Sequence, residues 1–190
     1  MKTLIAFVLL ALVPMFAQAE MSQADLQNLL KDRIDGLQFL TKNAMLLQAV
    51  QEQNRKQVSL DEIKKIDKEW IAGTSPLIKE LQENKVGKFL KNIIVQQADT
   101  YSEVFLTDDQ GANVACYPAT SDYWQGDEAK FIKSYNGGNG TVYVGPASFD
   151  ESTKTNAVQI SVPMIYNDKA IGVLIIGVKV SVLEAEKMNQ

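Results

Sequence analysis

Histidine is absent from the 190-residue chain, and cysteine occurs once, at Cys116. Without imidazole, neither a Ser-His-Asp nor a Cys-His catalytic centre can form, and a common zinc ligand is missing. A lone cysteine cannot form an internal disulfide, so we expect Cys116 to be a small buried residue on a strand. The sequence therefore predicts no metal site and no cofactor, and it leaves a hydrolase as a remote alternative.

Two short motifs that suggest catalysis have simpler explanations. The adjacent carboxylates Asp108 and Asp109 precede Gly111, a combination that is typical of a turn. The glycine-rich segment 137–140 resembles a phosphate-binding loop only in composition, because no Gly-Lys-Ser/Thr sequence accompanies it. We therefore expect that this protein is not an enzyme.

Long hydrophobic runs are also scarce, and the clearest one lies near the beginning of the chain. Lys2 precedes an apolar run over residues 4–13, and Ala17-Gln18-Ala19 has the small-x-small pattern of a cleavage site. Residues 1–19 are thus predicted to be a secretory signal peptide, which places the mature protein in the periplasm. A membrane anchor is the alternative, although Pro14 interrupts the run and makes it short for a membrane span.

Charge of one sign does not dominate the chain. The formal net charge of −4 argues against nucleic acid as a partner. Arginine is rare, because only Arg33 and Arg55 occur, and both fall in the first predicted helix. A bidentate guanidinium clamp for a carboxylate ligand is therefore not expected in a pocket elsewhere. A carboxylate ligand would instead need a backbone amide, a hydroxyl group or one of three lysines, Lys130, Lys133 and Lys154.

The first half of the chain has apolar residues three and four positions apart, as amphipathic helices do. One long helix is expected over residues 22–54, with Gly36 as its weak point. A capping box at Ser59 and a Ser-Pro pair at Ser75 predict two further helices. These helices are expected to act as a scaffold, or alternatively the first helix pairs with a second copy or with a receptor helix.

The second half changes to the two-residue alternation of strands. The last predicted strand is apolar on both sides, so it is expected to be central in its sheet. A short helix is expected over residues 126–134. The predicted strands cover residues 100–107, 112–117, 141–144, and two segments within 157–182 that are joined by a turn at Asn167-Asp168.

This order of elements predicts an α+β fold in which long N-terminal helices pack on a five-stranded antiparallel sheet. Sequential strands tend to pair, and if the last strand lies beside the first, the strand order is 2-1-5-4-3. We expect residues 20–98 to form a helical segment and residues 99–190 the sheet core of the same domain. The segment 117–155 is expected to arch over the second face of the sheet and to roof a pocket for a small ligand.

Several of these segments resemble a known family. Residues 142–180, VYVGPASFDESTKTNAVQISVPMIYNDKAIGVLIIGVKV, are similar to the second half of Cache domains, also called PDC domains. Val104-Phe105-Leu106-Thr107-Asp108 with Gly111 resembles the first hairpin of this family, and Asp122-Tyr123-Trp124 stands where the family has its roof segment. The resemblance covers about residues 101–182. These domains are the extracytoplasmic PAS-like sensors of bacterial receptors.

The resemblance implies a PAS-like sheet that holds a small amino acid, carboxylate or amine between the sheet and its roof. It also implies a role in signal transduction, with a membrane receptor or a histidine kinase as partner and with a possible homodimer. No second membrane span and no output domain follow residue 182, so a free-standing periplasmic form is expected. The alternative is a periplasmic protein–protein interaction module that uses its long N-terminal helix and has no ligand.

Tyr123 and Trp124 are the strongest candidates for ligand contact, because two large aromatic rings in a polar loop need cover from either the protein or a ligand. Ordinary packing of the roof is the alternative for both. The remaining candidates lie in the roof segment or on predicted strands, and each has a structural alternative such as capping or half-buried packing. They are Asp122, Asp127, Tyr101, Tyr117, Tyr143, Asp150, Gln159 and Ser161.

Overall fold

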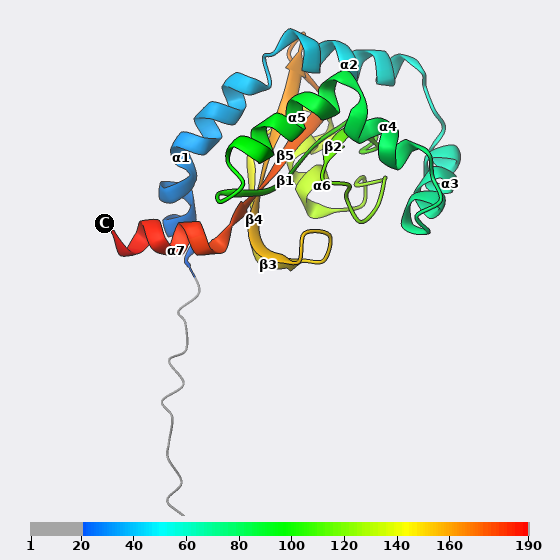
Figure 1. Cartoon of the computed structure of the whole chain (residues 1–190). Coiled ribbons are helices and arrows are strands. Elements are labelled where there is room, and N and C mark those ends of the chain that lie inside the picture. Colours follow the sequence, from blue (N-terminus) through cyan, green and yellow to red (C-terminus); the bar gives the residue numbers. More distant parts are fainter. Residues whose placement is uncertain (1–20, 190) are drawn as a thin grey trace, which may run out of the picture.

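The computed structural model describes residues 21–189, so the predicted signal peptide lies outside the described part of the chain. Figure 1 shows a curved sheet with helices on both sides. The helices are α1 (Gln23–Leu40), α2 (Ala44–Arg55), α3 (Leu60–Ile71), α4 (Leu77–Glu83), α5 (Lys85–Gln96), α6 (Ala129–Tyr135) and α7 (Val180–Met188). The strands are β1 (Tyr101–Thr107), β2 (Asn113–Tyr117), β3 (Tyr143–Asp150), β4 (Thr155–Tyr166) and β5 (Lys169–Lys179).

The predicted fold class and topology are confirmed. The five strands form one antiparallel sheet in the order β2-β1-β5-β4-β3. Strand β5 is central, as its two apolar sides require, and it pairs with β1 on one side and β4 on the other. Cys116 is fully buried on β2, as expected of a small apolar residue.

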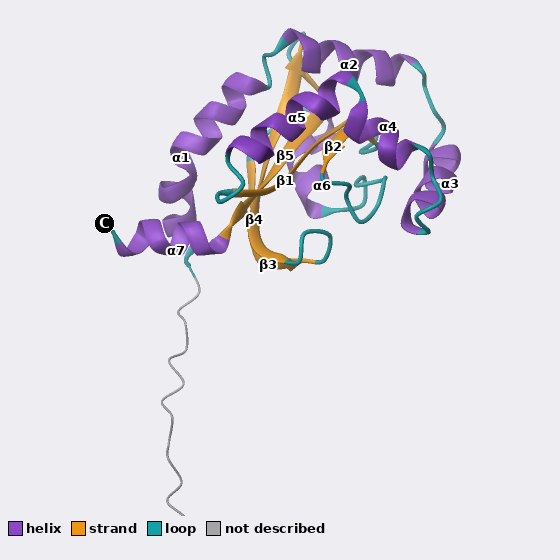
Figure 2. Cartoon of the chain, viewed as in Figure 1, coloured by secondary structure: helices purple, strands orange, loops and turns teal. Residues whose placement is uncertain are grey.

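One face of the sheet, which we call the helix face, is covered by α1, α2, α5 and α7 (Figure 2). Leu30 of α1, Val50 of α2 and Leu90 of α5 are fully buried in the same apolar cluster as Ile176 of β5. Burial of a large aliphatic side chain contributes about 1.5–3 kcal/mol, so this cluster holds the helices on the sheet.

The opposite face, which we call the roof face, is covered by the roof, residues 118–142, which connects β2 to β3 and includes α6. Phe131 of α6 packs in one cluster with Phe105 and Ile175 of the sheet. This cluster also contains Ile63 and Trp70 of α3, so α3 supports the roof rather than joining the other long helices.

The predicted single helix over residues 22–54 is wrong, because the chain breaks into α1 and α2. The break is not at Gly36, which lies within α1. It occurs at Thr41–Asn43, where Asn43 takes an extended conformation and its side-chain oxygen accepts a hydrogen bond from the backbone N–H of Met45 at 2.9 Å. Asparagine competes for backbone hydrogen bonds in this way, and it therefore starts a new helix here.

Two other segments differ from the sequence prediction. Strand β3 continues past the expected end at residue 144 to Asp150, with a register shift between Val144 and Ala147 that accommodates Pro146. The segment after Lys179 is the helix α7 rather than strand, and its Leu183 is fully buried on the helix face. None of the helices within residues 21–189 has the length and apolar content to span a bilayer.

Candidate functional site

A row of three residues crosses the centre of the roof face. Gly177 of β5 lies opposite Gln159 of β4 on one side and Glu103 of β1 on the other. Since Gly177 has no side chain, Glu103 reaches across it and its Oε1 accepts a hydrogen bond from Gln159 Nε2 at 2.7 Å. A Cβ at Gly177 would meet Ser102 Oγ and would lie 2.9 Å from Glu103 Cγ. The glycine thus makes the space that a buried carboxyl group occupies.

A hollow of about 210 Å³ opens beside this row, between the sheet and the roof. We call it the roof hollow. Its lining is mostly polar and comes from the roof, from β3 with its following turn, and from β4. The lining residues are Ser121, Glu128, Lys130, Ser148, Phe149, Asp150, Glu151, Ala157 and Gln159.

Carboxyl groups outnumber ammonium groups around the roof hollow. Glu128, Asp150 and Glu151 line it, and Glu103 lies directly behind Gln159. The opposing cation is Lys130, whose Nζ is 3.0 Å from Glu128 Oε2 and 5.4 Å from the centroid of the Phe105 ring. Because Glu128 already offsets the charge of Lys130, the field in the hollow is negative.

Burial changes the ionisation of these carboxyl groups. Glu103 is only 3% exposed, and loss of water, followed by the nearby charge of Asp150, raises its pKa to about 7. The pKa of Glu128 is also raised by burial, while the neighbouring Lys130 acts in the opposite direction. A carboxyl group whose pKa is near neutral, that of Glu103, therefore lies directly behind the lining of the roof hollow.

Helix α3 holds the roof above the sheet. One carboxylate oxygen of Asp67, Oδ1, accepts hydrogen bonds from the backbone N–H groups of Tyr123 at 2.8 Å and Trp124 at 3.0 Å. The indole N–H of Trp70 donates to the carbonyl oxygen of Thr120 at 2.8 Å. These bonds satisfy backbone groups of the roof that would otherwise be buried without partners. They therefore fix the position of residues 120–124 relative to α3.

Of the ten residues predicted for the site, Asp150 and Gln159 line the roof hollow. Asp150 also accepts hydrogen bonds from Ser152 and Thr153 in the turn that follows it, as a capping residue does. Ser161 lies two positions after Gln159 on the same face and pairs with Tyr143. Ser161 Oγ is buried and has no hydrogen-bond partner within the described residues.

The predicted acidic residues of the roof lie beside the hollow rather than in its lining. Asp122 Oδ1 accepts a hydrogen bond from Gln125 Nε2 at 2.5 Å. Asp127 is exposed. Both carboxylates lie close enough to Glu128 to raise its pKa further. They therefore add to the negative field at the rim of the hollow.

The two aromatic residues of the roof do not line the hollow. Tyr123 is 3% exposed and packs against Trp70 with ring centroids 5.8 Å apart. Trp124 donates its indole N–H to the carbonyl oxygen of Gln110 at 2.8 Å, and Lys64 Nζ lies 5.0 Å from the centre of its ring. In this structure both rings fix the roof to its surroundings, which is the packing alternative for these residues.

Tyr101 and Tyr117 lie on the helix face, away from the other predicted site residues. Strict two-residue alternation over the predicted strand 100–107 places Tyr101 on the same side as Glu103, and the structure shows that this expectation is wrong. Ser102 is an extra residue in the pairing of β1 with β5, and such a bulge reverses the alternation before it. Tyr117 lies opposite Val104 and packs against the helix-face cluster, with Lys91 Nζ 5.2 Å from its ring centre.

Sequence reasoning missed the residue with the most unusual environment, Glu103. Its signal was present, because a carboxyl group stands alone in the otherwise uncharged strand TYSEVFLT. What was missing was the partner strand, since only the register shows that Glu103 faces a glycine and reaches Gln159. The other residues of the hollow that were not predicted are Ser121, Glu128, Ser148, Phe149, Glu151 and Ala157.

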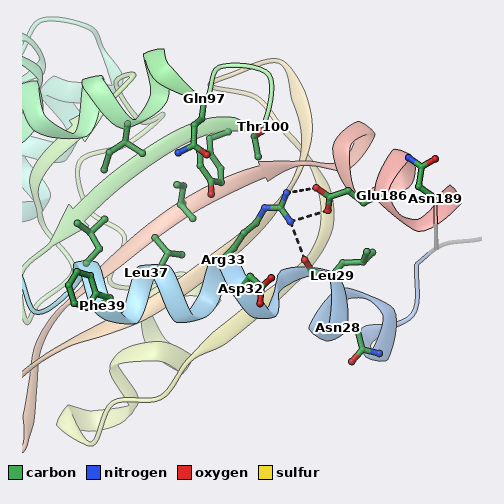
Figure 3. A pocket seen from close by; sticks show the side chains of 15 residues that line it. Asn28, Leu29, Asp32, Arg33, Leu37, Phe39, Gln97, Thr100, Glu186 and Asn189 are labelled. Atoms are coloured by element: carbon green, nitrogen blue, oxygen red, sulfur yellow. Dashed lines mark hydrogen bonds and ion pairs between the residues drawn. The ribbon is translucent and has the colours of Figure 1, made fainter.

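A larger groove, of about 930 Å³, lies on the helix face between α1, α7 and the end of α5 (Figure 3). Arg33 of α1 extends into it and forms a bidentate pair with Glu186 of α7, with N–O distances of 3.0 and 2.6 Å. Arg33 also donates to the carbonyl oxygen of Leu29 at 3.1 Å. Because the guanidinium group of Arg33 is already paired with Glu186, it is not free to bind a small charged ligand. The roof hollow is therefore the better candidate for such a ligand.

The described residues also limit which cofactors fit. Within residues 21–189, no group of three or more Cys, Asp or Glu side chains is placed to hold a metal ion.

No family model matches the sequence, and no curated protein matches it. Several solved structures are similar in fold. The sensory domain of the Campylobacter jejuni chemoreceptor Tlp3 with isoleucine bound has 16% sequence identity and a TM-score of 0.43, over 87% of this chain and 66% of that one. The sensor domain of the Vibrio cholerae histidine kinase DctB has 18% identity and a TM-score of 0.43, over 86% of this chain and 56% of that one.

A third similar structure is the ligand-binding domain of the Pseudomonas aeruginosa amino-acid chemoreceptor PctC in complex with GABA. It has 16% identity and a TM-score of 0.41, over 71% of this chain and 64% of that one. This chain therefore spans between about half and two thirds of the length of these three domains. All three are sensor or ligand-binding domains of chemoreceptors or a histidine kinase.

Proposed function

We propose that this protein is a non-catalytic periplasmic module that binds a small molecule in the roof hollow and acts in signal transduction. The observation that carries the proposal is the polar hollow between sheet and roof, with Glu103 buried behind it. A carboxyl group with a strongly raised pKa beside a cleft is a frequent mark of a functional site. The bound and unbound forms would be read by a membrane receptor or a histidine kinase.

A thermal-shift screen of residues 20–190 tests this function. The panel contains amino acids, small carboxylates and small amines, and it begins with isoleucine and GABA. A ligand present at ten times its Kd is expected to raise the free energy of unfolding by about 1.4 kcal/mol, because it binds only the folded state. The measurement is the shift in Tm as a function of ligand concentration.

A variant that fills the hollow provides the control. Ser148→Trp places an indole ring at the lining and is expected to remove the ligand-dependent shift. Ser181→Trp, at an exposed position on α7, is expected to retain it. Absence of a shift with every member of the panel, or an equal shift in both variants, contradicts the proposed function.

A second candidate function is a protein–protein interaction through α1, and the groove on the helix face favours it. Phe39, at one end of this groove, is 79% exposed, which is unusual for a phenylalanine. We expect Phe39→Asp to abolish a concentration-dependent dimer measured by light scattering. Ile71→Asp, which changes an exposed residue of α3, is the matched control. A wild-type protein that stays monomeric and captures no partner from periplasmic extract argues against this function.

A further inference from the structure

The charge balance of the roof hollow points to the class of molecule that it holds. Glu128 is bound to Lys130, so this pair is close to neutral. Asp150 and Glu151 then remain at the lining, and Glu103 remains beneath it. Glu151 is exposed and paired with Lys154, so its charge is largely compensated. The uncompensated acidity is therefore concentrated on Asp150 and Glu103.

The surroundings of Glu103 show why it lacks a cationic partner of its own. Gln159 donates one hydrogen bond to it, and Cys116 lies nearby on β2 and interacts with its charge. Asp150 from β3 and Glu128 from the roof repel a charge on Glu103, and Lys130 attracts it. Ser102 Oγ, next to Gly177, is also buried without a hydrogen-bond partner within the described residues. A guest that brings a positive charge would balance this group.

Size and geometry restrict the guest further. A volume of about 210 Å³ equals the share of about seven water molecules in liquid water. The carboxylates within residues 21–189 do not form a group that would hold a metal ion. A small organic ammonium ion meets both conditions, since it is compact and each N–H donates to a carboxylate or amide oxygen.

Provided that the roof hollow is the ligand site, we propose that it takes a small organic amine in its ammonium form, and that Glu103 ionises when this cation binds. Before binding, the carboxyl group of Glu103 is mostly protonated below about pH 7. The ammonium ion favours the carboxylate form, so the O–H bond breaks and the proton passes to solvent. No other bond changes. Binding and proton release are therefore coupled. Ionisation of Glu103 raises the affinity for the ammonium ion, and the bound ammonium ion lowers the pKa of Glu103 by the equivalent amount.

Three probes of equal length test the chemical class. They are 1,5-diaminopentane, glutarate and 1,5-pentanediol, which share a five-carbon chain and differ in terminal charge. Isothermal calorimetry at pH 8 is expected to detect binding of the diamine only. Glu103→Gln is expected to weaken that binding about tenfold, because it removes a buried negative charge directly behind the lining of the hollow. Glu69→Gln, at an exposed position of α3, is the control and is expected to bind as the wild type does.

Proton release provides a readout that a purely structural role of Glu103 would not change. Titrations at pH 6 in two buffers with different ionisation enthalpies are expected to show release of about 0.4 proton per diamine bound, the amount that a tenfold coupling and a free-state pKa of about 7 give. The same titrations at pH 8.5 are expected to show almost none, because Glu103 is then already ionised. Glu103→Gln is expected to show none at either pH.

The outcomes separate this inference from the proposed function. Binding of glutarate in place of the diamine, or diamine binding without proton release at pH 6, overturns the inference and leaves the ligand site intact. If none of the three probes binds while another compound stabilises the protein and Ser148→Trp removes that effect, the amine class is wrong but the function stands. If neither the three probes nor any member of the thermal-shift panel binds, both the amine inference and the proposed function are wrong.

Discussion

Replacing Glu103 with glutamine is expected to remove about 3 kcal/mol of the stability that the protein loses between pH 4 and pH 8. The pKa of Glu103 is raised from its ordinary value of 4.5 to about 7 in the folded state. Between these values the folded state holds a proton that the unfolded state has released, so the free energy of unfolding falls as pH rises. The favourable contribution is fully present below pH 4.5 and is lost as the pH passes 7. A shift of this size corresponds to about 3 kcal/mol.

The measurement is urea denaturation of wild type and Glu103→Gln at several pH values. The stability of the variant relative to wild type is expected to increase by about 3 kcal/mol from pH 4 to pH 8, which corresponds to roughly 6–12 °C in Tm. Asp108, whose pKa is raised to about 6 chiefly by burial, is present in both proteins and cancels in the comparison. Glu151→Gln, at an exposed position, is the control. If the free energy of unfolding changes with pH in the same way in wild type and Glu103→Gln, the raised pKa of Glu103 is refuted.

Removing the carboxylate of Asp67 is expected to destabilise the protein by about 2–4 kcal/mol and to release the roof. One oxygen of Asp67 accepts hydrogen bonds from two roof amides, those of Tyr123 and Trp124. Asp67→Ala leaves both N–H groups without their acceptor, and each such loss in a buried region costs about 1–3 kcal/mol. Asp67→Asn retains an acceptor oxygen, so a smaller loss of about 1 kcal/mol is expected.

Chemical denaturation measures the stability change, and hydrogen exchange at the amides of residues 123 and 124 measures the release of the roof. Glu69→Ala, an exposed position on the same helix, is the matched control and is expected to change neither. Because the roof forms one wall of the hollow, Asp67→Ala is also expected to lose any ligand-dependent thermal shift. Unchanged protection of the two amides in Asp67→Ala would show that α3 does not hold the roof.

The site was predicted less completely than the fold, and particular residues show why. Gln159 was identified because it belongs to a long, regular segment whose faces follow from alternation, whereas Asp150 was identified as part of the expected roof segment 117–155 and lies on a strand that was predicted to end at residue 144. Tyr101 was placed on the wrong side because a single bulge at Ser102 reverses the alternation, and nothing in the local sequence marks that bulge. Tyr123 and Trp124 were recognised as roof residues, but whether an aromatic ring contacts a guest or its neighbours depends on partners far away in the chain. Here those partners are Trp70 and Gln110.

The helices show the same limit. Periodicity of apolar residues identified the helical half, and Ser59 caps α3 as predicted, whereas α4 begins after Pro76 without the side-chain cap expected from Ser75. The break at Asn43 was missed because asparagine is tolerated within helices and becomes a cap only where the chain must turn. That turn lets α1 and α2 follow the curved sheet (Figure 1).

The sequence by itself determined the α+β class, the strand order and the central place of β5, because each follows from local patterns of apolar residues and from the order of the elements. Only the tertiary structure decided the chemistry of the roof hollow. Burial of Glu103, its contact with Gln159 across Gly177 and its exposure to the field of Asp150 depend on the register of three strands and on the position of the roof. Electrostatic effects of this kind depend on distances through space, and residues 103, 150 and 159 come together only when the sheet has formed.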